Sequence, residues 1–147
     1  MSLKETIVAD MKSAMRDRES FRLETIRLLR AAIQRKEVDD KIELGDQDVV
    51  QIIQKMIKQS ADAAQQFSSG GREDLADKEK AGIAILQGYL PEQLSEDEIA
   101  SLIQQAIAET GANSMKDMGK VMGILKSRTQ GRADMGAVSA NIKSILS

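Results

Sequence analysis

Basic residues gather on one face of a helix that is expected to begin near Ser114, and their spacing suits contact with a phosphate backbone. Lys116, Lys120, Gly123 and Ser127 follow one another at steps of three or four positions, so they share one side of a helix. Two ammonium groups beside a residue without a side chain would let a nucleic-acid backbone approach closely. The candidate nucleic-acid-binding residues are Lys116, Lys120, Gly123, Lys126, Arg128 and Arg132. The alternative interpretation is an ordinary solvated helix face.

Glu79 is of chemical interest because it lies within an apolar stripe. It follows Leu75 by four positions and precedes Ile83 by four, so a helix would turn it toward the interior. A carboxylate placed there loses hydration that only a partner can replace. We therefore predict a structural ion pair, and the candidate partners of Glu79 are Arg27, Arg30 and Arg72. The alternative is an acid–base residue with a raised pKa.

Residues for nucleophilic or metal chemistry are scarce. The sequence has no Cys and no His, which excludes a thiolate nucleophile and a Cys-based zinc site and removes the commonest general base. Asp39 and Asp40 are adjacent, but no further metal ligands accompany them. Residues 68–71, Ser-Ser-Gly-Gly, are better explained as a helix end than as an activated serine. We therefore expect no catalytic residue, no metal and no cofactor.

Seven helices are expected to position these residues. Apolar residues recur every three or four positions between stop signals, and no strand-like alternation is present. Ser2 with Glu5 and Ser95 with Glu98 match the capping-box pattern, Asp46 is a predicted N-cap, and Pro91 ends the fourth helix. The core residues are Ile, Leu, Ala and Met, with two Phe, one Tyr and no Trp in the chain. This composition is typical of helix-on-helix packing.

The predicted fold is all-α and multihelical. A four-helix N-terminal subdomain over residues 1–91 is expected to be followed by a small three-helix C-terminal subdomain over residues 92–147. The net charge is −2, but residues 111–147 carry six basic and two acidic side chains, while residues 92–110 carry five acidic and none that is basic. The sequence has no secretory h-region and no apolar run of about 18 to 20 residues. A cytoplasmic location without a membrane partner is therefore expected.

Five short motifs resemble the YqeY family. They are ETIRLLR at 24–30, GGREDL at 70–75, YLP at 89–91 followed by Leu94-Ser95, DMGKVMG at 117–123, and GRAD at 131–134. The combination is specific, and the resemblance covers essentially the whole chain.

The resemblance implies a relation to tRNA. The YqeY family is similar to the C-terminal tail of the GatB subunit of the tRNA-dependent amidotransferase, a helical module that engages tRNA. The family is described as having carbon–nitrogen ligase activity with glutamine as amido-N-donor. The resemblance covers only the tail, and nothing in the sequence corresponds to the domain that binds ATP or to the amidase subunit. The first hypothesis is a tRNA-binding accessory module that works with an amidotransferase or another protein. The alternative is a non-catalytic protein-interaction module without RNA binding. A third hypothesis, an enzyme of its own that uses glutamine, is the weakest, because a glutaminase normally needs a Cys or an activated Ser.

Overall fold

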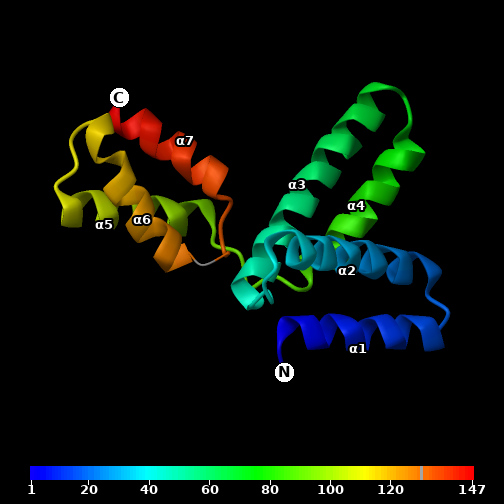
Figure 1. Ribbon diagram of the computed structural model, residues 1–147. Helices are drawn as coiled ribbons and strands as arrows, with labels where there is room; N and C mark the ends of the chain where they lie inside the picture. Colours follow the sequence, from blue (N-terminus) through cyan, green and yellow to red (C-terminus); the bar gives the residue numbers. More distant parts are fainter. Residues whose placement is uncertain (130) are drawn as a thin grey trace. The chain divides into compact units, whose positions relative to one another are not determined.

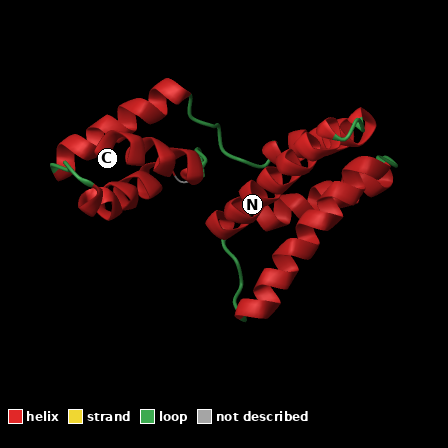
Figure 2. Cartoon of the chain, turned by 90° about the horizontal axis from the view of Figure 1, so that it is seen from above, coloured by secondary structure: helices red, strands yellow, loops and turns green. Residues whose placement is uncertain are grey.

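The chain divides into two compact helical units. The computed structural model describes residues 1–129 and 131–147, and it separates Met1–Leu90 from Pro91–Ser147. Every regular element in this described part of the chain is a helix, and none is a strand (Figure 2). The all-α prediction is confirmed.

Four helices form the first unit. Their bounds are α1 Leu3–Arg16, α2 Ser20–Asp40, α3 Asp46–Ser69 and α4 Glu73–Gln87. The helix α1 runs antiparallel to α2, and α3 runs antiparallel to α4, so the unit is built from two helical hairpins (Figure 1). The core where these hairpins meet consists of Ile7, Ile26, Leu29, Ile33, Leu44, Val49, Ile53 and Leu86.

The capping residues of this unit follow the sequence rules at α1 but not at α3. Ser2 caps α1 in the expected reciprocal arrangement, since its hydroxyl accepts from the Glu5 N–H and the Glu5 carboxylate accepts from the Ser2 N–H. The prediction that Asp46 caps α3 is wrong, because Gly45 is the N-cap. Asp46 accepts a hydrogen bond of 2.9 Å from the N–H of Leu3 instead. Local preference assigns the Asp46 side chain to the N-cap of α3, but this side chain binds the N–H of Leu3 in a distant segment instead.

The described residues of the second unit form three α-helices and one short 3₁₀ turn. Their bounds are α5 Glu96–Thr110, the 3₁₀ turn η1 Met115–Asp117, α6 Met118–Thr129 and α7 Met135–Leu146. The core between them consists of Ile103, Ala106, Val121, Leu125, Ala133, Val138, Ile142 and Leu146. Ser95 caps α5 by accepting from the Glu98 N–H, and Asp134 caps α7 by accepting from the Gly136 N–H.

The segment before α5 is tied to the connection between α6 and α7. The N–H of Leu94 donates to the carbonyl of Arg132 at 2.8 Å, and the Gln93 amide donates to the carbonyl of Gly131 at 3.1 Å. These bonds hold the segment before α5 against the connection that follows α6. None of the described helices combines the length and the apolar character needed to cross a bilayer.

Candidate nucleic-acid interface

One side of α6 anchors this helix in its unit and leaves the opposite side in solvent. Val121, Leu125 and Thr129 are buried, and they recur at four-residue steps along the inner side. The Thr129 hydroxyl donates to the Leu125 carbonyl at 2.9 Å, which satisfies its polar group in the core. The outer face is formed by the exposed residues Lys116, Gly119, Lys120, Gly123, Lys126 and Ser127. We call this set the α6 face.

The three lysines of the α6 face have no internal counter-charge. Lys116, Lys120 and Lys126 are exposed, and none of them forms an ion pair with another described residue. The helix α6 itself has no acidic side chain. Lys116 lies in the 3₁₀ turn rather than in the α-helix, so the helix register applies to Lys120 and Lys126 but not strictly to Lys116.

Two of the six candidate residues are engaged inside the unit. Arg128 Nη2 lies 2.6 Å from Glu109 Oε2, which joins α6 to α5. Arg132 Nε donates to the Glu92 carbonyl at 3.0 Å and so supports the segment before α5. These partners lie far away in the sequence, and helical spacing alone gave no signal of them.

The glycines of the α6 face have open space where a side chain would stand. A Cβ atom built on Gly119 or on Gly123 would meet no atom within 4 Å. Close packing against another described helix therefore does not explain either residue. Sequence reasoning omitted Gly119 from the candidate residues, although its position four residues before Gly123 was the available signal.

The expected ion pair of Glu79 is not formed. Glu79 is half-buried in α4, and among the described residues no basic side chain lies within ion-pair distance of it. Arg72 instead places Nη2 at 3.0 Å from Asp74 Oδ2. Arg30 places Nη1 at 3.2 Å from the Met11 sulfur. Arg27 is exposed. Arg72 is the N-cap of α4, and the carboxylate of Asp74 in the first turn of this helix is its local partner in place of Glu79.

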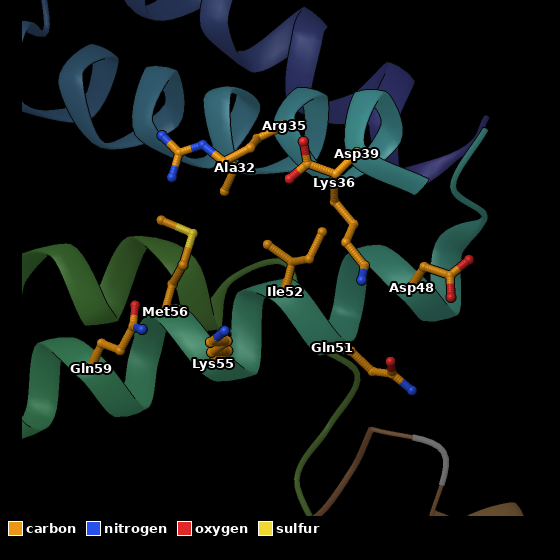
Figure 3. A pocket seen from close by; sticks show the side chains of 10 residues that line it. All are labelled: Ala32, Arg35, Lys36, Asp39, Asp48, Gln51, Ile52, Lys55, Met56 and Gln59. Atoms are coloured by element: carbon orange, nitrogen blue, oxygen red, sulfur yellow. The ribbon is translucent and has the colours of Figure 1, made fainter. Parts of the chain in front are cut away.

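One groove of the first unit lies between α2 and α3 and has a volume of about 420 Å³. Ala32, Ile52 and Met56 point into the space between the helices (Figure 3). Polar side chains surround them: Arg35, Lys36, Asp39, Asp48, Gln51, Lys55 and Gln59. Lys36 Nζ lies 2.7 Å from Asp40 Oδ2, and the hydrogen bond to this carboxylate raises the pKa of the lysine. Because cations and carboxylates are mixed, no sign of charge dominates. No group of three metal-ligating side chains occurs among the described residues.

The fold and the α6 face together define a class of protein: a small, all-helical protein of two units, one of which presents lysines and glycines on an exposed helix. The chain belongs to the YqeY family, since the family model described as "Yqey-like protein" matches residues 4–146. The resemblance inferred from the sequence motifs is confirmed.

Fungal proteins are among the relatives. A protein of Pyrenophora tritici-repentis named "Altered inheritance of mitochondria protein 41, mitochondrial" is 36% identical over 94% of this chain and 77% of its own length. Proteins of the same name from Kluyveromyces lactis and Candida glabrata are 35% and 30% identical over 65% and 59% of this chain. The chain matches only 54% and 49% of the lengths of these two proteins.

The expected cytoplasmic location is contradicted by these relatives. All three are named as mitochondrial proteins, and one of them matches nearly the whole chain. The expectation rested on the lack of a secretory h-region and of a membrane-spanning run. Neither feature distinguishes the cytoplasm from an organelle that is entered by another route.

Proposed function

We propose that this YqeY-family protein is an RNA-binding accessory module whose ligand is tRNA, and that the α6 face carries the contact. The observation that carries the proposal is the pairing of unneutralised lysines with glycines that have open space around them. A glycine inside an exposed helix costs about 1 kcal/mol relative to alanine. Nothing in the described chain packs on Gly119 or Gly123. Close approach of an external ligand to the helix backbone would explain why these two positions carry no side chain.

The residues favour a ligand with a regularly charged backbone. Lys120 and Lys126 project from an α-helix that has no acidic residue, and Lys116 lies in the 3₁₀ turn directly before this helix. Ammonium groups at such intervals suit successive phosphates, and contacts of this kind depend on charge rather than on base sequence. The second unit, Pro91–Ser147, contains no aromatic residue on which bases could stack. Recognition of RNA shape and backbone follows.

The resemblance to the GatB tail supplies the choice of tRNA, and the role proposed is binding rather than catalysis. The family description as a carbon–nitrogen ligase with glutamine as amido-N-donor would then apply to an assembly in which another protein carries out the chemistry. The bound tRNA would be presented to that protein.

A tRNA titration at two salt concentrations tests the proposal. The full chain is compared with the double variant Lys116→Glu, Lys120→Glu. The control is Lys12→Glu, Arg16→Glu, which reverses two exposed charges at the same four-residue spacing on α1. We expect the first variant to lose binding and the control to retain it. Each phosphate contact removed should lower the slope of log K against log salt by about 0.7 to 0.9.

A second variant tests the role of the open space. Gly123→Gln adds an uncharged, helix-compatible side chain where nothing lies within 4 Å, so the fold should persist while tRNA binding weakens. If the parent fails to bind tRNA at low salt, or if the α1 control loses binding equally, the proposal is wrong. The protein-interaction module without RNA binding would then be the better explanation.

A further inference from the structure

A second concave surface lies in the first unit and is separate from the α6 face. It is enclosed by α2, α3 and α4 and has a volume of about 270 Å³. Each helix contributes residues spaced by three, four, seven or eleven positions, so each offers one face to the groove. The apolar residues that carry the argument are Phe21, Leu28, Met56, Phe67 and Leu75. We call this surface the phenylalanine groove.

Both phenylalanines of the chain line this groove instead of the core. Phe21 and Phe67 are half-buried, and neither belongs to the cluster of core residues formed by the first unit. A phenylalanine in a core typically buries about 150 to 250 Å². Leu28 on the same wall keeps 60% of its surface exposed. Large apolar side chains that meet at a hollow without filling it are typical of a surface that a partner completes.

The charged residues that line the groove carry a net charge of −1. Glu24 and Glu79 line it together with a single cation, Lys78. None of the three forms an ion pair with a described residue. Glu79 is half-buried as a residue, and no basic side chain among the described residues forms an ion pair with it. A cationic group of a ligand would pair with Glu79, and a ligand that covers the groove would exclude water from this pair and so strengthen it.

We propose that the phenylalanine groove binds an amphipathic helical segment of a partner protein, with large apolar anchors and a Lys or Arg beside them. The apolar anchors pack against Phe21, Leu28 and Phe67, and the cation pairs with Glu79. The volume of about 270 Å³ lies below the range of about 300 to 1,000 Å³ that is usual for small-molecule sites, which favours side-chain anchors. Helix-in-groove recognition by apolar residues at helical spacing is an established mode.

The proposal for the phenylalanine groove does not rest on RNA binding. The phenylalanine groove lies within Met1–Leu90, whereas the α6 face lies within Pro91–Ser147. The proposal adds a protein partner to the proposed tRNA-binding role, and failure of either proposal leaves the other standing.

A peptide-display selection on the full chain tests the groove. The probe is a library of helical peptides of about 16 residues, randomised at anchor and charge positions. We expect the selected peptides to carry large apolar residues three or four positions apart, together with Lys or Arg. Leu28→Glu should weaken their binding by about tenfold or more, since an exposed anchor contact is replaced by a charge. The matched control is Val38→Glu, because Val38 is 74% exposed and lies outside the groove.

Charge variants of Glu79 distinguish a specific binding site from nonspecific hydrophobic binding. Glu79→Lys should reverse the charge preference of the selected peptides from basic to acidic, and Glu79→Gln should abolish that preference with little change in side-chain size. Circular dichroism checks that each variant is folded.

Three results would overturn the proposal. The first is a selection on the parent that enriches no peptide over the starting library, or that enriches acidic ones. The second is equal binding of the selected peptides by the parent and by Leu28→Glu. The third is self-association of the parent that Leu28→Glu abolishes in sedimentation, since a second copy of the chain would then occupy the groove.

Discussion

The hydroxyl of Tyr89 donates a hydrogen bond of 2.6 Å to Oδ2 of Asp10, which joins the residues just after α4 to α1. Arg22 of α2 approaches the same carboxylate, with Nη2 at 3.9 Å from Asp10 Oδ1. Burial is the main cause that raises the pKa of Tyr89 well above its usual range, and the hydrogen bond and the negative charge of Asp10 add to it. The tyrosine of the Tyr-Leu-Pro motif therefore links the chain after α4 to α1 within the first unit.

Removal of this hydroxyl should destabilise the first unit. Tyr89→Phe keeps the ring but leaves Asp10 without its donor. Hydrogen bonds to charged groups contribute about 1.5 to 3 kcal/mol, and the exposure of this pair favours the lower end of that range. Urea denaturation followed by circular dichroism measures the change. An unchanged midpoint would mean that water replaces the tyrosine hydroxyl at no net cost.

The same contact predicts how stability depends on alkaline pH. The chain has one tyrosine, so the near-ultraviolet absorbance of phenolate reports Tyr89 alone. In the urea-unfolded chain the phenol should titrate near its ordinary pKa of about 10, and in the folded chain it should titrate higher. Because the folded pKa is raised, the contribution to stability is complete below about pH 10 and is lost as pH rises through the folded pKa.

Asp10→Asn is the control for this titration. It should lower the folded pKa of Tyr89 only part of the way, since burial is the larger cause. A phenol that titrates alike in the folded and unfolded chains would contradict the prediction.

Glu37 should make the first unit sensitive to acid. Its Oε2 lies 2.8 Å from Lys4 Nζ and accepts a hydrogen bond of 2.9 Å from the N–H of Leu44. The bond from Lys4, followed by the one from Leu44, lowers the pKa of Glu37. A depressed folded pKa contributes stability above the unfolded value of about 4.3, and this contribution is lost as pH falls through the folded pKa.

Glu37→Gln should therefore lower the urea midpoint more at neutral pH than in acid. The control is Glu43→Gln, since Glu43 is 87% exposed and lies 3.5 Å from the same lysine. Its removal should change the midpoint little. Equal effects of the two variants would show that the contacts of Glu37 with Lys4 and Leu44 stabilise the unit no more than the exposed contact of Glu43 does.

Two glycines of the second unit should respond to alanine with opposite signs. Gly123 lies inside α6 in open space, so Gly123→Ala should raise the free energy of unfolding by up to about 1 kcal/mol. Gly111 ends α5 with a φ of 65°, a conformation that disfavours a side chain, so Gly111→Ala should lower it by about 1 kcal/mol. Thermal denaturation compares the two. Destabilisation by Gly123→Ala would indicate an internal packing role instead.

Core substitutions should affect the two units separately. Ile53 and Ile142 are fully buried in different cores, and truncation of such a residue to alanine costs about 2 to 5 kcal/mol. Because Tyr89 lies in the first unit, its fluorescence follows that unit, whereas circular dichroism follows both. We expect Ile53→Ala to shift the fluorescence transition and Ile142→Ala to leave it in place. A shift of that transition by Ile142→Ala would show that the units unfold together.

The sequence by itself determined where most helices begin and end. Ser2, Ser95 and Asp134 cap helices through atoms only two or three residues away, so the information is local. The outer face of α6 could likewise be predicted, because the helical period alone fixes which residues of one helix share a side. The family motifs are local strings of the same kind.

Only the tertiary structure decided which helix faces meet and which side chains pair. The period predicts that Phe21 and Leu28 share an apolar side of α2, but the other hairpin covers only part of that side and leaves a groove. The partners of Asp46, Arg128 and Tyr89 are Leu3, Glu109 and Asp10, each of them distant in sequence. Helical spacing relates residues within one helix, whereas these contacts depend on how separate helices pack, and no pattern within a single segment encodes that arrangement.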